Sequence, residues 1–209
     1  QGNTIYDKDG KPEKVTYVLD RPIITTAVVF NAEQIDGLPP RELTTPLSEW
    51  ERIERAEAIA KGIESQGVTI EHRLGDGAYY SPTDDRIVMP ERGQFPTPDA
   101  YYATLLHEIG HATGHESRLN RDLSGGFGSE SYAKEELRAE IASMIVGEQL
   151  QIGYDPSQHH AYLKSWVKVI KEDPKEILRA VKDADAISKY VLSFSKSLEQ
   201  SKENLKEIR

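Results

Sequence analysis

The spacing of apolar residues predicts that most of the chain from residue 44 onward is helical. Apolar positions recur every three or four residues in five segments, residues 48–66, 97–114, 131–152, 156–173 and 174–200. This period is typical of helices that bury one face against a core. The side chains expected on the buried faces are Trp50, Ile53, Ile59, Ile63, Tyr101, Tyr102, Leu105, Leu106, Ile109, Leu137, Ile141, Met144, Ile145, Tyr162, Trp166, Val169, Ile170, Ile177, Leu178, Val181, Ile187 and Val191.

The ends of two of these segments carry helix-terminus patterns. Ser48 and Glu51 have the spacing of a capping box, in which each side chain bonds to the backbone of the other residue. Thr97 and Pro98 supply an N-cap and a proline at the first helical position. Gly114 is placed to cap the C-terminus of the same helix.

Three short segments between the first two helices have the pattern of β-strands. Residues 68–74 alternate between apolar and polar side chains, as a half-buried strand does. Residues 78–81 and 86–89 are joined by a Pro-Thr-Asp-Asp turn at residues 82–85, which predicts a hairpin. Together with the helices, these strands place the protein in the α+β class.

The first part of the chain differs from the rest in its pattern. Residues 14–19 and 23–30 are runs rich in β-branched side chains, and Gly-Leu-Pro-Pro at residues 37–40 interrupts them. We therefore predict two parts. Residues 1–43 are the end of an upstream domain or an N-terminal β arm, and residues 44–209 are the main domain.

Composition excludes several functions. Lysine and arginine number 26 against 35 aspartates and glutamates, a formal net charge of -9. We therefore do not expect this chain to bind nucleic acid. The chain has no cysteine, which excludes disulfides and thiolate metal sites. No apolar run reaches the roughly 18 residues of a membrane span, and we expect a cytoplasmic protein that does not bind membranes.

Two of the six histidines, His107 and His111, frame a His-Glu-x-x-His pattern within the second predicted helix. One helical turn takes about 3.6 residues, so both imidazoles project from one face, about 6 Å apart along the axis. Two imidazoles so placed can bind one Zn²⁺, and Glu108 lies beside them, where it can accept a proton from water. The pattern is typical of zinc peptidases. The alternative is an ordinary helix with two surface histidines.

A catalytic zinc ion needs a third protein ligand. Ser117 has the spacing of one known arrangement but is not a zinc ligand, and His115 lies beyond the helix end in the wrong register. The later helix offers Glu136 and Glu140, one turn apart on one side. We predict Glu136 as the ligand and Glu140 as the acceptor that fixes the tautomer of a ligating imidazole. The reverse assignment and a solvated acidic face are the alternatives.

The segments around these residues resemble the zincin-like metallopeptidase domain of ArdC-type antirestriction proteins, which also occurs in conjugation primases and in polyvalent proteins of plasmids and phages. The resemblance covers most of the chain from about residue 21. It rests on residues 107–115, 117–121, 127–129 and 132–137, and continues through residues 29–34, 79–90 and 160–163.

The resemblance implies a zincin-like fold, in which a small mixed sheet packs on the His-Glu-x-x-His helix and a helical part follows. It also implies a metal held by two histidines and a glutamate, and a role in protecting incoming DNA from restriction. In that family a single-stranded-DNA-binding domain precedes the peptidase domain, and residues 1–43 correspond only to its end.

We therefore expect a zinc-dependent peptidase that hydrolyses a protein or peptide substrate with a metal-activated water. Glu108 is the expected general base, and Tyr132 and His160 are candidate donors to the oxyanion, although either can instead be a packed core residue. The strand at residues 78–81 or at 86–89 can pair with an extended substrate. Mn²⁺ or Co²⁺ can occupy such a site as well as Zn²⁺.

Two other functions fit the same residues. The first is a zinc-containing interaction module that counters restriction without proteolysis, with the restriction machinery as a candidate partner. The second is a structural unit that binds no metal.

Overall fold

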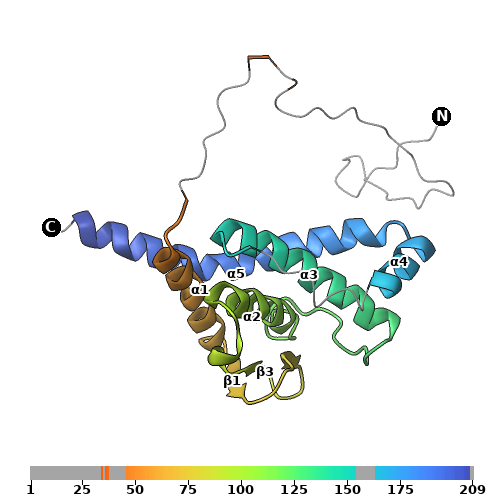
Figure 1. The fold of residues 1–209 in the computed structure, drawn as a ribbon. Coiled ribbons are helices and arrows are strands. Elements are labelled where there is room, and N and C mark those ends of the chain that lie inside the picture. The colour runs from red at the N-terminus through yellow and green to blue at the C-terminus, as the bar shows by residue number, and fades with distance from the viewer. Residues whose placement is uncertain (1–33, 35, 38–45, 154–162, 208–209) are drawn as a thin grey trace, which may run out of the picture. The chain divides into compact units, whose positions relative to one another are not determined.

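The computed structural model describes residues 34, 36–37, 46–153 and 163–207, with side chains up to residue 196. The chain divides into two units, residues 1–44 and 45–209. Almost all described residues belong to the second unit, which Figure 1 shows in colour. The prediction for residues 1–43 falls almost wholly outside the described residues.

Helices form most of the second unit. None of the described helices is long and apolar enough to cross a membrane. Each predicted helical segment overlaps one of them, and the predicted start of the fourth segment, at residue 156, lies outside the described residues. The helices are α1 (Glu49–Glu64), α2 (Pro98–Ala112), α3 (Glu130–Leu150), α4 (Leu163–Glu172) and α5 (Glu176–Glu207), with a short 3-10 helix, η2 (Arg92–Gln94), before α2.

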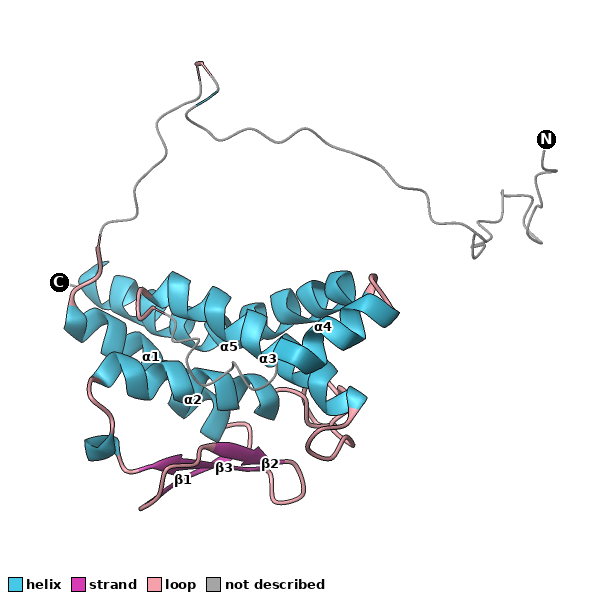
Figure 2. Ribbon diagram, turned by 45° about the vertical axis from the view of Figure 1, so that its right-hand side comes forward, coloured by secondary structure: helices cyan, strands magenta, loops and turns pink. Residues whose placement is uncertain are grey.

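The strands form one small mixed sheet in the order β1-β3-β2. The predicted hairpin is confirmed, because β2 (Tyr79–Ser81) pairs antiparallel with β3 (Arg86–Pro90). The other neighbour of β3 is β1 (Thr69–Arg73), which runs parallel to it. Figure 2 shows this sheet as a layer beneath α2, with α3 and α5 beyond that helix. The predicted α+β class, a small mixed sheet packed on the helix of the paired histidines, is confirmed.

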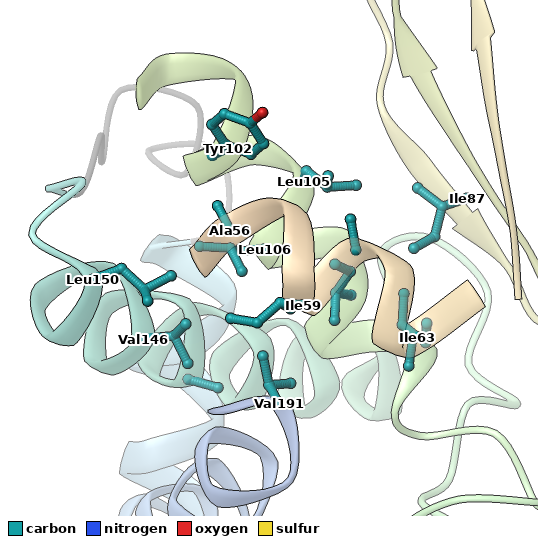
Figure 3. Packing of buried hydrophobic residues seen from close by; sticks show 14 of the residues in the cluster. Ala56, Ile59, Ile63, Ile87, Tyr102, Leu105, Leu106, Val146, Leu150 and Val191 are labelled. Carbon is teal, nitrogen blue, oxygen red and sulfur yellow. The ribbon is translucent and has the colours of Figure 1, made fainter. Parts of the chain in front are cut away.

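The main core lies where the sheet and four helices meet. Ile59 of α1, Ile87 of β3, Leu105 of α2, Val146 of α3 and Val191 of α5 belong to one buried cluster (Figure 3). Each such side chain contributes about 1.5–3 kcal/mol when it is removed from water. This packing fixes α2, and with it the paired histidines, between the sheet and α3.

Some large apolar side chains that were predicted to be buried are exposed. Trp50 is 81% exposed because it lies in the first turn of α1, ahead of that helix's buried positions, which begin at Ala56. In α5 the buried face includes Ala180 and Ala184, and small alanines were not part of the predicted pattern. The other exposed residues that were predicted to be buried are Met144, Leu178 and Val181.

The helix-start predictions hold, but the C-terminal one does not. The Thr97 hydroxyl accepts from the backbone N–H of Ala100 (3.1 Å), and Pro98 is the first residue of α2. The helix is capped at its other end by Thr113, in a right-handed conformation, so Gly114 is not the C-cap. A Cβ at Gly114 would lie 2.8 Å from Leu123 Cδ2, so this glycine instead makes room for the following loop.

Candidate metal centre

His107 and His111 lie one turn apart on the buried face of α2 and turn their Nε2 atoms toward each other. The two Nε2 atoms are 3.1 Å apart. Both imidazole side chains are largely buried, so most of their surface is shielded from bulk water. The helix therefore presents two nitrogen ligands to one point.

Glu136 of α3 faces the same point from the opposite side. Its Oε2 is 3.6 Å from Nε2 of His107, and its Oε1 is 3.4 Å from Nε2 of His111. Ligand atoms bound about 2.0–2.2 Å from one tetrahedral ion lie about 3.4 Å from each other. The observed separations are near this value, although each nitrogen–oxygen distance is to a different oxygen of Glu136. With one ligand atom from each residue, the three atoms lie within 4.8 Å of one another. In the part of the chain that the structure describes, this is the group of side chains that could hold a metal ion.

Two further carboxylates of α3 face the outward ring nitrogens. Oε2 of Glu140 lies 3.3 Å from Nδ1 of His107, and Oε1 of Glu135 lies 3.3 Å from Nδ1 of His111. A carboxylate that accepts a hydrogen bond from Nδ1 keeps Nε2 directed at the metal, and the His111–Glu135 contact has hydrogen-bond geometry. Glu136 is the glutamate of the candidate ligand group, and Glu140 lies on the outer side of His107. The assignment of Glu136 as the ligand and Glu140 as the outer acceptor stays a prediction.

Sequence reasoning did not identify Glu135 or its partner Arg121. The prediction pairs Glu136 with Glu140, which lies one helical turn later on the same side, and gives Glu135 no role. The structure buries Glu135 as well as Glu136, and Arg121 forms an ion pair with Glu135 (2.6 Å). No periodicity links these two residues, because Arg121 lies in the loop between α2 and α3 and Glu135 lies in α3.

The carboxylates make the pocket favourable for positive charge. Burial lowers the pKa of His107, but Glu136 and Glu140 more than offset this and raise it to about 9. Burial opposes the charge of His111 as well, whereas Glu135 and Glu136 raise its pKa to about 10. The pKa of Glu136 is held well below its usual range, since the two imidazoles outweigh its burial. The negative potential that stabilises imidazolium stabilises a divalent cation in the same place.

A cleft of about 730 Å³ opens onto the three candidate ligands. Glu108 lines it and is 6% exposed, so its carboxylate is beside the histidines and largely shielded from solvent. The edge strand β2 contributes Tyr79 and Tyr80 to one wall, and the loop before α3 contributes Leu123 to another. The cleft can therefore admit a chain-like ligand next to the candidate metal centre.

The remaining predicted site residues have different outcomes. Tyr132 lines this cleft, and its ring centroid lies 5.4 Å from that of Phe127. His160 is outside the described residues. Nδ1 of His115 is 2.8 Å from the Ser117 hydroxyl, and neither residue belongs to the candidate ligand group.

Comparison with known proteins places the chain among peptidase-like domains. The model of the zincin-like metallopeptidase family matches residues 54–183. Two proteins named DNA primase TraC, both from Escherichia coli, are each 56% identical to this chain over 92% of its length. The match covers 13% of one and 18% of the other, so the chain spans less than a fifth of these relatives.

Solved structures agree with the family model. The Mn(II)-bound antirestriction ArdC protein from plasmid R388 is 33% identical, with a TM-score of 0.68 over 92% of this chain and 67% of that chain. The metal-free form is 34% identical, with a TM-score of 0.69 over 93% and 68%. The manganese in that relative and the His-His-Glu group found here both support metal binding. This chain belongs to the zincin-like metallopeptidase family and has the ArdC-type form of its domain.

Proposed function

We propose that this domain is a metal-dependent peptidase with Zn²⁺ held by His107, His111 and Glu136. The observation that carries the proposal is the convergence of three ligand atoms, all within 4.8 Å of one another, beside a buried glutamate in an open cleft. Zinc fits the two nitrogens and one oxygen of this set, and Mn²⁺ or Co²⁺ are the other candidates.

The protein groups around the ion have separate tasks. A bound divalent ion lowers the pKa of water toward about 7 and polarises the scissile carbonyl. Glu108 accepts the proton of the attacking water and passes it to the leaving amine. Tyr132 lines the cleft, and its hydroxyl is the candidate donor to the oxyanion. His160 stays a candidate for the same task on the sequence alone.

Strand β2 is the part of the sheet that can receive an extended peptide. It lies at the sheet edge and lines the cleft, whereas β3 is paired on both sides, with β1 and with β2. An extended substrate can therefore add to β2 through backbone hydrogen bonds. Of the two strands considered from the sequence, the one at residues 79–81 fits this task.

Replacement of the general base tests the proposal. Glu108→Gln keeps the shape of the side chain but cannot take up a proton, so it should abolish cleavage while metal content stays unchanged. The matched control is Glu116→Gln, which alters an exposed glutamate of the same region. Both variants and the parent are incubated with a peptide library and the products identified by mass spectrometry. Cleavage by Glu108→Gln at the parental rate, or none by the zinc-loaded parent, would refute the proposal.

A second function is favoured by the likeness to ArdC, a protein named for antirestriction. In that case the metal centre stabilises an interaction module that protects incoming DNA in the cytoplasm, through contact with the restriction machinery rather than by proteolysis. An assay of transfer into a restricting host separates the two. If Glu108→Gln protects as well as the parent, the interaction module is the better description.

A further inference from the structure

Arg121 lies in the loop between α2 and α3 and is directed back toward the end of α2. Its side chain is 10% exposed and donates through all three nitrogen atoms. Nη1 donates to the Thr113 hydroxyl (2.8 Å), and Nη2 donates to the carbonyl of Gly110 (2.8 Å). Nη2 and Nε donate to the two carboxylate oxygens of Glu135, at 2.6 and 3.0 Å.

The carboxylate of Glu135 connects this guanidinium to the metal centre. Its Oε1 accepts from Arg121 and also lies 3.3 Å from Nδ1 of His111. A two-point arginine–carboxylate pair is geometrically restrictive, because two parallel N–H donors fix both oxygens at once. The orientation of Glu135, and through it the ring plane of His111, therefore depends on where Arg121 is held.

The surrounding loop is built to hold Arg121 in this position. The backbone N–H of Arg121 donates to the carbonyl of Gly114 (2.9 Å), and that of Leu119 donates to the carbonyl of Thr113 (2.8 Å). A Cβ on Gly114 would come within 3.0 Å of Nη2 of Arg121, so only glycine leaves this approach free of contact. The residue after Arg121, Asp122, already lines the cleft.

We propose that Arg121 is a positioning residue of the metal centre: through Glu135 it sets the orientation of His111 and so the affinity for the metal ion. The inference rests on the proposed metal ligands but not on peptide hydrolysis. Arg121 touches neither the ion nor a substrate in this scheme. It acts only through Glu135.

Arg118 offers a matched comparison within the same loop. Its side chain is 1% exposed, and Nε donates to the carbonyl of Ala112 (2.7 Å) at the same end of α2. It also pairs with the carboxylate of Asp85, where Nη1 is 3.0 Å from Oδ2. Neither Ala112 nor Asp85 belongs to the candidate ligand group. A purely structural effect of losing a buried loop arginine should therefore appear equally in both positions.

The test compares Arg121→Lys with Arg118→Lys in the whole chain. Zn²⁺ and Co²⁺ affinities are measured by titration against a chelator, the Co²⁺ absorption spectrum reports the ligand geometry, and thermal unfolding of the metal-free protein reports stability. Lysine keeps the charge but cannot hold both oxygens of Glu135. Arg121→Lys should weaken metal binding about 10–100-fold and change the spectrum. Arg118→Lys should lower stability and leave affinity and spectrum at parental values.

A second variant tests the connection if Arg121→Lys folds poorly. Glu135→Asp keeps the charge but withdraws the carboxylate from His111, and it should weaken metal binding to a similar extent. The inference is wrong if Glu135→Asp binds metal like the parent, or if Arg121→Lys weakens binding no more than Arg118→Lys does. If the parent itself binds no metal, the proposed function fails together with this inference. If the parent binds metal and the variants behave as just described, only the inference on Arg121 fails.

Discussion

Nδ1 of His107 lies 3.3 Å from Oε2 of Glu140, on the side of the imidazole ring that faces away from Glu136. The two carboxylates, one turn apart on α3, therefore face different nitrogens. Glu136 faces the Nε2 atoms that can bind an ion, and Glu140 lies on the Nδ1 side of His107.

Removal of Glu140 should weaken metal binding without eliminating it. In Glu140→Ala the ring of His107 loses the carboxylate that orients it, so we expect affinity for Zn²⁺ to fall about 10–100-fold. Glu148→Ala, which removes an exposed glutamate of the same helix, is the control. Competition with a chromophoric chelator measures the Zn²⁺ affinity of each variant. Equal affinities of the two variants would show that Glu140 does not support His107.

Metal affinity should rise with pH. The pKa of both histidines is raised, to about 9 for His107 and about 10 for His111, so the metal-free pair holds at least one proton at neutral pH. A metal ion must displace it, and release of one proton makes the apparent affinity rise about tenfold per pH unit up to about pH 9. Calorimetry in buffers of different ionisation enthalpy counts the protons. Binding without proton release would contradict this.

Stability of the metal-free protein should change with pH in the opposite direction. A histidine whose pKa is raised on folding contributes stability that is complete below its unfolded value, about 6.5, and is lost as the pH rises through the folded value. For His107 and His111 the loss extends from about pH 6.5 to about pH 10. Urea unfolding in the presence of a chelator measures it.

The control for this pH effect is Glu136→Gln, which removes a carboxylate that both histidines share. Its loss of stability over the same pH range should be smaller than that of the parent. The prediction fails if the parent is equally stable across this range, or if Glu136→Gln loses as much stability as the parent does.

Gly114→Ala should destabilise the domain through the loop that carries Arg121. The added Cβ would lie 2.8 Å from Leu123 Cδ2 and 3.0 Å from Arg121 Nη2, so the loop must shift. Overpacking of this kind costs about 1–3 kcal/mol. Gly126→Ala in the same loop is the control, since a Cβ there meets nothing within 4 Å. Chemical denaturation compares the two variants, and equal unfolding free energies would count against the packing described for Gly114.

The sequence predicts the local parts of this structure well. Thr97 and Pro98 set the start of α2, and the apolar stripe of that helix fixes which face is buried, so the shared direction of His107 and His111 follows from helical geometry alone. The β2–β3 hairpin is also a local feature, because it pairs two strands that follow each other in the sequence, and it was predicted correctly.

Features that depend on distant contacts were not predictable from the pattern. The parallel pairing of β1 with β3, rather than with β2, joins strands that are not consecutive in the chain, so no turn sets it. The exposure of Leu178 follows from an alanine-lined face that periodicity of large side chains does not detect. The Arg121–Glu135 pair joins a polar loop to a helix, and neither segment carries a pattern that points to the other.

Anomalous X-ray diffraction from crystals grown with Zn²⁺ tests the metal centre most directly. The proposed site predicts one zinc peak about 2.0–2.2 Å from Nε2 of His107, Nε2 of His111 and a carboxylate oxygen of Glu136, with Glu140 and Glu135 on the outer nitrogens. A zinc peak elsewhere in the domain, or one at the histidines with Glu136 turned away, would contradict it.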